Sequence, residues 1–156
     1  MGIGPSTKET TLHHFRDPLL DIIDTDDDID LLGIMVVGTP QSNEDKVFVG
    51  QRVATWAEAM RADGVILSCD GWGNSHVDFA NTMEEVGKKN IPIVGLTFVG
   101  TQAQFVVTNK YMDTIVDFNK SIEGIETEVV GENNVVSKDA RKTLAFLKLK
   151  MKKAGE

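Results

Sequence analysis

The apolar positions of this chain fall into short continuous runs that are separated by stripes at helical spacing. Residues 31–37 form an apolar run rich in β-branched side chains, and residues 65–69 and 91–98 form two further runs between turn-forming residues. Short apolar runs bounded in this way are typical of strands that are buried on both faces of a sheet. We therefore expect three buried strands, at 31–37, 65–69 and 91–98.

Two amphipathic segments lie between these runs. One follows a capping signal at Ser42 and Asp45, and the other follows a capping signal at Ser75 and Asp78. The expected buried stripes are Val49, Val53, Trp56, Ala57 and Met60 in the first helix, and Phe79, Ala80, Met83 and Val86 in the second. Strand, loop and helix thus repeat about every 30 residues, which predicts βαβ units with a parallel sheet.

Helix signals also mark both ends of the chain. Ser6 and Glu9 form a capping box, which predicts a short helix over 7–15. Ser137 is expected to cap a final helix, and four of its apolar residues share one face: Ala140, Leu144, Leu147 and Met151. The chain should therefore begin and end with a helix.

The region after residue 99 is less regular. Residues 105–107 could form a fourth strand, and alternating apolar positions suggest an edge strand at Ile125, Thr127 and Val129. Residues 111–118 fit a helix or an extended segment, and we favour the helix. The complete pattern predicts one α/β domain over residues 1–156. Its sheet is mostly parallel and built from βαβ units, with helices on both faces.

Composition and charge narrow the class of protein. The chain has 156 residues, a net charge of −8 and a pI of about 4.8, so an acidic surface disfavours nucleic acid as a partner. No apolar run is long enough to span a membrane, and the N-terminus lacks the apolar core of a signal peptide. The single cysteine, Cys69, excludes an internal disulfide framework. We expect a cytoplasmic protein.

Three loops follow the predicted strands, at 38–43, 70–76 and 100–104. Because the carboxyl ends of parallel strands meet at one edge of a sheet, these loops should lie together beside helix N-termini. Backbone N–H groups there suit a carboxylate or a phosphate, which favours a small-anion or amino-acid-sized ligand. The candidate ligand-binding residues are Gly38, Thr39, Gln41, Gly71, Trp72, Gly73, Asn74, Gly100 and Thr101. Neither a dinucleotide fingerprint nor a P-loop follows any of the strands.

The loop over 70–78 carries the most chemistry. His76 and Asp78 stand in the first turn of the expected helix, and a histidine there can exchange protons near neutral pH. These two residues are the candidates for acid–base catalysis. A second interpretation stays open, in which Trp72 packs against a neighbouring domain and His76 is simply exposed.

Other polar clusters do not predict a metal site. His13 and His14 are adjacent in a predicted helix, so their side chains diverge and cannot chelate one ion without a third group. The aspartates within 24–30 resemble a calcium loop, but Ile29 occupies the required glycine position. We interpret that stretch as a solvated acidic linker, and we expect no metal and no cofactor in this chain.

Several stretches resemble a known family: GIGPSTKE at 2–9, HHFRDPL at 13–19, VVGTPQ at 36–41, GWGNSHVDFA at 71–80 and NKYM at 109–112. They resemble the carboxy-terminal portion of the D-proline reductase proprotein, in the glycine, sarcosine, betaine and proline reductase superfamily. Within it the resemblance is strongest to a small stand-alone relative of that portion from proline-reductase gene clusters. The resemblance covers nearly the whole chain. It implies a place in Stickland fermentation of clostridia, in which D-proline is reduced to 5-aminovalerate.

The same resemblance implies that two catalytic devices are missing. In the family, the proprotein cleaves itself at a cysteine that becomes a pyruvoyl group, and that cysteine corresponds to Gly2. Glycine has neither the side-chain nucleophile nor the Cβ that this chemistry needs, and only Met1 precedes it. A selenocysteine loop of the same systems corresponds to the loop in which Trp72 takes the middle position. An indole cannot replace a selenol as a nucleophile.

The resemblance therefore implies an accessory or paralogous subunit of D-proline reductase. Its expected partners are other proline-reductase subunits, especially a relative of the amino-terminal part of the proprotein, and a homo-oligomer is also possible. The alternative is an amino-acid-binding or sensing domain of the same system without reductase activity. A third interpretation keeps reductase activity within an assembled complex, with His76 or Asp78 as an acid or base.

Overall fold

A computed structural model describes residues 17–69, 75–100, 104–125, 129, 132 and 134–155. The elements in chain order are α1 (Pro18–Ile23), α2 (Asn43–Ala59), β1 (Val65–Cys69), α3 (Ser75–Lys88), β2 (Ile93–Thr97), β3 (Ile115–Asp117) and α4 (Ser137–Ala154). None of these helices is long and apolar enough to cross a membrane.

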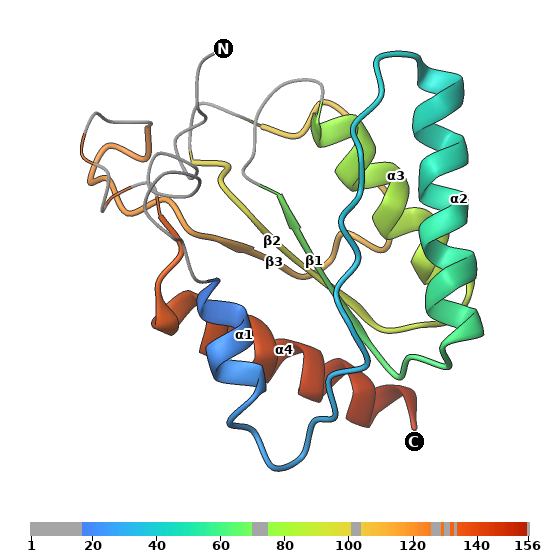
Figure 1. The fold of residues 1–156 in the computed structure, drawn as a ribbon. Helices are drawn as coiled ribbons and strands as arrows, with labels where there is room; N and C mark the ends of the chain where they lie inside the picture. The colour runs from blue at the N-terminus through green and yellow to red at the C-terminus, as the bar shows by residue number, and fades with distance from the viewer. Residues whose placement is uncertain are drawn as a thin grey trace.

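The strands of the described ranges form one parallel sheet in the order β1-β2-β3. Val65 pairs with Ile93 at the start of β1, and Cys69 pairs with Thr97 at its end. Figure 1 shows α2 and α3 together on one side of this sheet and α1 and α4 on the other. The predicted α/β class, with a mostly parallel sheet and helices on both faces, is confirmed.

Each face of the sheet carries its own apolar core. The core under α1 and α4 is built from Leu19, Ile23, Leu96, Phe98, Val116, Phe118, Ala140 and Leu144. The core under α2 and α3 is built from Val53, Ala54, Ala57, Phe79, Met83, Val86, Ile91 and Ile93. Successive residues of β2 alternate between these two cores, and all five are buried. β2 is therefore the central strand.

The stripes of α3 and α4 are where the sequence predicts them. All four expected α3 residues are buried, as are Ala140, Leu144 and Leu147 of α4. The cap of α4 lies one residue earlier than expected, because Val136 is the N-cap and its N–H donates to Asp139 Oδ2 at 2.9 Å. The cap of α2 is confirmed, since Ser42 Oγ accepts from the Asp45 N–H at 3.1 Å.

The predicted stripe of α2 is partly wrong. Val53 and Ala57 are buried as expected, but Trp56 is 56% exposed and Met60 is 41% exposed. The buried face of α2 instead begins at Lys46 and continues through Gly50. This face is turned toward α3, where a small residue and a long polar one fit better than two large apolar side chains.

Residues 31–37 do not form the buried strand that their apolar run predicts. The segment is extended but joins no ladder, and Val36 is 95% exposed. Its ends are anchored in different cores, because Ile29 packs against the α1/α4 core and Val37 against the α2/α3 core. The segment thus passes from one face of the sheet to the other without adding a strand.

The region after residue 99 also differs from prediction. Residues 105–107 are not a strand, and the favoured helix over 111–118 is wrong because Ile115–Asp117 pairs in parallel with β2. Val116 is 1% exposed, so the sheet supplies a core that the local sequence does not reveal. The helix expected over 7–15 lies outside the described residues, as does most of the edge strand expected around Thr127.

Candidate functional site

The most polar buried feature is an ion pair between the first turns of α2 and α3. Lys46 and Asp78 are each the fourth residue of their helices, and the Lys46 ammonium donates to Asp78 Oδ2. Lys46 is 1% exposed and Asp78 is 7% exposed. Burying two charges is unfavourable unless they are paired and hydrogen-bonded. The two side chains must therefore stay in contact for the charges to be tolerated in the core.

The close approach of α2 to α3 creates the place for this pair. A Cβ on Gly50 would lie 2.1 Å from Asn81 Nδ2, so a larger residue at position 50 would displace the Asn81 side chain. Asn81 Nδ2 in turn donates to the Lys46 carbonyl oxygen at 3.0 Å. One glycine and one amide therefore hold the two helix starts together.

Asp78 has hydrogen-bonding capacity left over. Its Oδ1 atom is buried and has no hydrogen-bond partner among the described residues. A buried carboxylate oxygen without a donor is costly, and a functional role is one of the reasons for which folded proteins keep such an atom. Asp78 also belongs to the predicted capping signal of α3, and its carboxylate has a further partner in Lys46 of α2.

His76 lies on the sheet side of the same helix turn. It is 2% exposed, and its ring centroid is 4.6 Å from that of Phe105, which also stacks on Phe79. Burial lowers the pKa of His76 from its usual value, so the neutral imidazole is favoured. The interpretation of His76 as an exposed residue is wrong.

The carboxyl ends of β1 and β2 complete this neighbourhood. Cys69 and Thr97 are register partners in the last pair of the β1–β2 ladder. Thr97 is fully buried, and its Oγ1 has no hydrogen-bond partner among the residues described. Its side chain shares the α3 face of β2 with Gly95, which is in close approach to Phe79. Thr97 Oγ1 is therefore a second buried polar atom without a partner among the described residues, at the carboxyl end of β2.

The structure describes only some of the predicted ligand-binding residues. Gly38, Thr39 and Gln41 lie on the loop that leads into α2 and are close in sequence to Lys46. Gly100 has a positive φ of 59°, and its N–H donates to Asp117 Oδ2 at 2.8 Å. The other candidates lie outside the described residues: Gly71, Trp72, Gly73, Asn74 and Thr101. The candidate pyruvoyl position, Gly2, lies there as well.

Lys46 is not among the predicted site residues, although the sequence carries a signal for it. It stands four residues before Gly50 and seven before Val53, so it continues the buried stripe of α2 toward the N-terminus. A lysine on a buried stripe predicts a buried acidic partner. Asp78 is 32 positions away, and only the packing of α2 on α3 identifies it.

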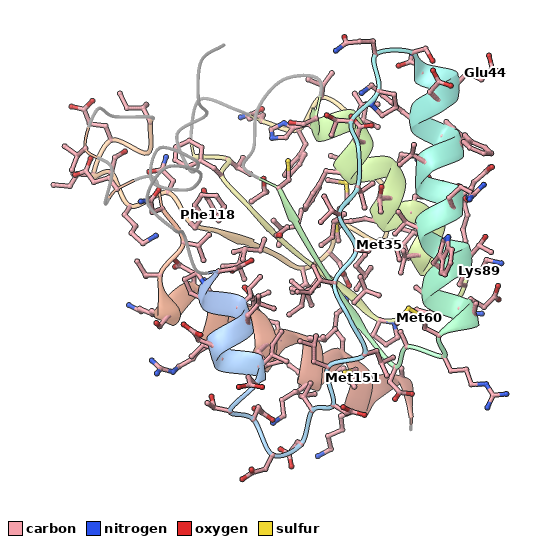
Figure 2. All side chains as sticks on the ribbon, viewed as in Figure 1. Met35, Glu44, Met60, Lys89, Phe118 and Met151 are labelled. Atoms are coloured by element: carbon pink, nitrogen blue, oxygen red, sulfur yellow. The ribbon has the colours of Figure 1, made fainter. Side chains whose placement is uncertain are left out.

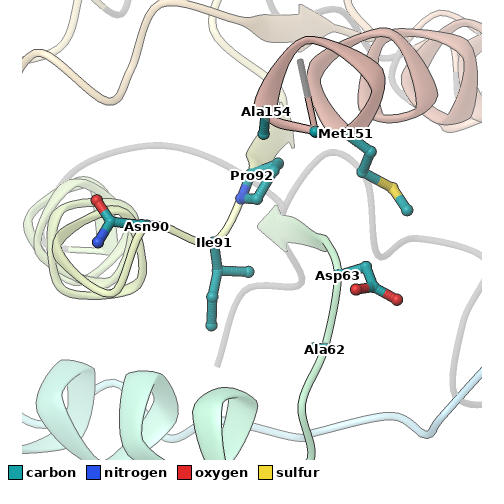
Figure 3. Close-up of a pocket in the computed structure, with 8 residues that line it drawn as sticks. Ala62, Asp63, Asn90, Ile91, Pro92, Met151 and Ala154 are labelled. Atoms are coloured by element: carbon teal, nitrogen blue, oxygen red, sulfur yellow. The ribbon is translucent and has the colours of Figure 1, made fainter.

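Other places in the described residues carry less chemistry. No group of three His, Cys, Asp or Glu side chains gathers there as metal ligands would. A cavity of about 400 Å³ lies at the opposite, amino-terminal edge of the sheet (Figure 3). It is lined by Ala62, Asp63, Asn90, Ile91, Pro92, Met151, Ala154 and Gly155. Asp63 is the one charged side chain among them, so the cavity offers little to fix a ligand.

Comparison with known proteins finds one matching family and one similar curated protein. The family described as glycine/sarcosine/betaine reductase component B subunits matches residues 2–143. The chain is also 42% identical over 146 residues to the D-proline reductase proprotein PrdA of Acetoanaerobium sticklandii. That match covers 94% of this chain but only 23% of the relative. No solved structure matches.

The family match and the identity to the proprotein agree with the resemblance seen in the sequence. The more specific resemblance, to a small stand-alone protein of proline-reductase gene clusters, stays a prediction. The match over residues 2–143 includes β1, β2, β3 and the two helix starts that carry Lys46 and Asp78. This chain belongs to the family of glycine, sarcosine and betaine reductase component B subunits.

Proposed function

We propose that this chain is an accessory subunit of a D-proline-reductase-type amino-acid reductase and that it does not form a pyruvoyl group. The observation that carries the proposal is its relation to the proprotein over 94% of its own length but 23% of the relative's. It thus corresponds to one portion of a larger reductase component. Its partner would be a protein related to the amino-terminal part of that proprotein.

Two residues support a role without independent catalysis. Gly2 occupies the position that the resemblance assigns to the pyruvoyl-forming cysteine, and it offers no side-chain nucleophile. Trp72 occupies the position that the resemblance assigns to a selenocysteine of related subunits, and an indole offers no selenol. A cytoplasmic location and the partner's identity are parts of the same proposal.

Co-expression tests this function. The chain is expressed together with the amino-terminal subunit that self-cleavage of the Acetoanaerobium sticklandii proprotein yields, and native mass spectrometry then measures the complexes. We expect a stable heteromer in which this chain keeps its full mass, without cleavage at Gly2. Two species that never associate would refute the accessory role.

A second candidate function is the binding of an amino acid without reaction. It rests on the buried Lys46–Asp78 pair, where Asp78 Oδ1 has no partner among the described residues. An ammonium group could donate to that oxygen, and the N-terminal turn of α3 could accept a carboxylate. His76 and Asp78 as an acid and a base belong to this candidate only if an assembled complex supplies the reaction.

Calorimetry distinguishes this candidate. Wild-type chain is titrated with D-proline, L-proline, glycine and 5-aminovalerate, alone and in the complex. Asp78→Asn should weaken any binding by tenfold or more, whereas Asp27→Asn, at an exposed carboxylate, should not. The absence of heat with all four compounds in both states would exclude amino-acid binding.

A further inference from the structure

The segment 31–36 exposes an apolar surface that a folded chain of this size would normally cover. Its large apolar residues have high exposed fractions: Leu31 43%, Leu32 50%, Ile34 66%, Met35 40% and Val36 95%. Neighbouring side chains of an extended segment point to opposite sides. Because consecutive residues here are all exposed, neither side of the segment is fully covered.

The segment 31–36 passes from one face of the sheet to the other near the edge strand β1. It runs between Ile29 in the α1/α4 core and Val37 in the α2/α3 core, and β1 is the outermost strand on that side. Figure 2 shows Met35 on the part of the segment that passes in front of the sheet, with Met60 at the nearby end of α2. Met60 is 41% exposed and adds to the same apolar surface.

β1 lies at the edge of the sheet that the described residues form. β1 pairs only with β2 within the described residues, so its outer edge joins no ladder. Exposed strand edges and unpaired apolar segments are the usual sites of strand addition by another chain. We propose that the segment 31–36, together with the outer edge of β1, is the surface on which the partner subunit docks with an apolar strand.

Charge favours a partner of different sequence over a second copy of this chain. Exposed carboxylates bracket the apolar segment, with Asp27 and Asp30 before it and Glu44 and Asp45 after it, and no charged residue lies between. Two copies docked at this surface would bring these carboxylates together, and each chain carries a net charge of −8. The docked strand should therefore have lysine or arginine at its ends.

The comparison with the proprotein favours the same occupant. More than three quarters of that relative lies outside the match, so the matched portion belongs to a much larger component. An apolar surface that is exposed on the portion alone is expected where the remainder docks. This inference rests on the proposed accessory function and assigns its partner surface.

Matched variants test the surface. Val36→Asp places a charge on the segment, while Ile122→Asp makes the same kind of change at a residue that is fully exposed on another loop. Each variant is co-expressed with the amino-terminal subunit of the proprotein. We expect Val36→Asp to weaken the heteromer at least tenfold, and Ile122→Asp to leave it unchanged. Hydrogen exchange at 31–36 should slow in the wild-type complex.

The outcomes separate this surface from the proposed function. If wild type and Val36→Asp form the heteromer equally well, the surface is wrong and the accessory function stands. If wild type forms no heteromer, both the accessory function and the docking surface are refuted. A homodimer of wild type that Val36→Asp abolishes would show that a second copy is the occupant, which also overturns the proposal.

Discussion

The Lys46 ammonium and the Asp78 carboxylate form an ion pair that joins α2 to α3, although the residues lie 32 positions apart in the sequence. Both side chains are at least nine-tenths buried. Most ion pairs of the described residues lie at the surface, where they contribute little to stability. This pair differs because either partner alone would be an uncompensated buried charge.

We expect Lys46→Met to destabilise the fold by about 3–5 kcal/mol, because Asp78 is then buried without its partner. The double variant Lys46→Met with Asp78→Leu should recover most of that loss, since no charge remains in the core. Urea unfolding of the single and double variants measures both effects. A cost below about 1 kcal/mol for Lys46→Met would show that the pair contributes little.

The stability of the protein should fall as the pH drops below 6.5, the usual pKa of histidine, because burial lowers the pKa of His76 in the fold. The unfolded chain then binds a proton that the folded chain does not, which favours unfolding. His76→Phe keeps a ring against Phe105 and removes the titrating group. Melting temperatures from pH 7 to 5 should therefore fall less steeply for this variant than for wild type. Equal slopes would contradict the prediction.

Asp26 affects stability in a separate, more acidic pH range. Its hydrogen bond with Lys148 lowers its pKa below 3.8, so its protonation does not contribute between pH 7 and 5.

Gly95→Ala should destabilise the sheet by roughly 1–3 kcal/mol through overpacking. A Cβ at this position would lie 2.6 Å from Phe79 Cζ, which is itself held by its contact with Phe105. Gly38→Ala is the matched control, because a Cβ there meets nothing within 4 Å. Its effect should stay within about 0.5 kcal/mol. Partial rescue of Gly95→Ala by Phe79→Leu would assign the cost to this contact.

Alanine substitutions along α2 test which of its faces is buried. Val53 is 8% exposed and Trp56 is 56% exposed. We expect Val53→Ala to cost about 1.5–3 kcal/mol, and Trp56→Ala to cost much less in spite of its larger side chain. Thermal unfolding of the two variants side by side makes the comparison. A larger loss from Trp56→Ala would mean that the stripe expected from periodicity is the buried one.

Local pattern alone identifies the elements whose burial follows from their own residues. The strand at 65–69, the strand at 93–97 within the predicted run 91–98, and the helix from Ser75 are identified because their apolar spacing is typical of a buried strand or a helix. The stripe of α4 is predicted for the same reason. The parallel pairing of β1 with β2 also follows from the sequence, because a strand, a helix and a second strand in succession favour a parallel connection.

Tertiary contact decides the rest. The apolar run at 31–37 is as strand-like as the others, yet no neighbour pairs with it in the described part of the chain, so it stays exposed. The reverse holds for Ile115–Asp117, which becomes a strand because β2 offers it a paired edge and a core. In the sequence, Lys46 looks like an ordinary helical lysine. Only the packing of α2 on α3, with Gly50 against Asn81, places Asp78 beside it. Such contacts depend on which surfaces face each other, and residue spacing along one element does not contain that information.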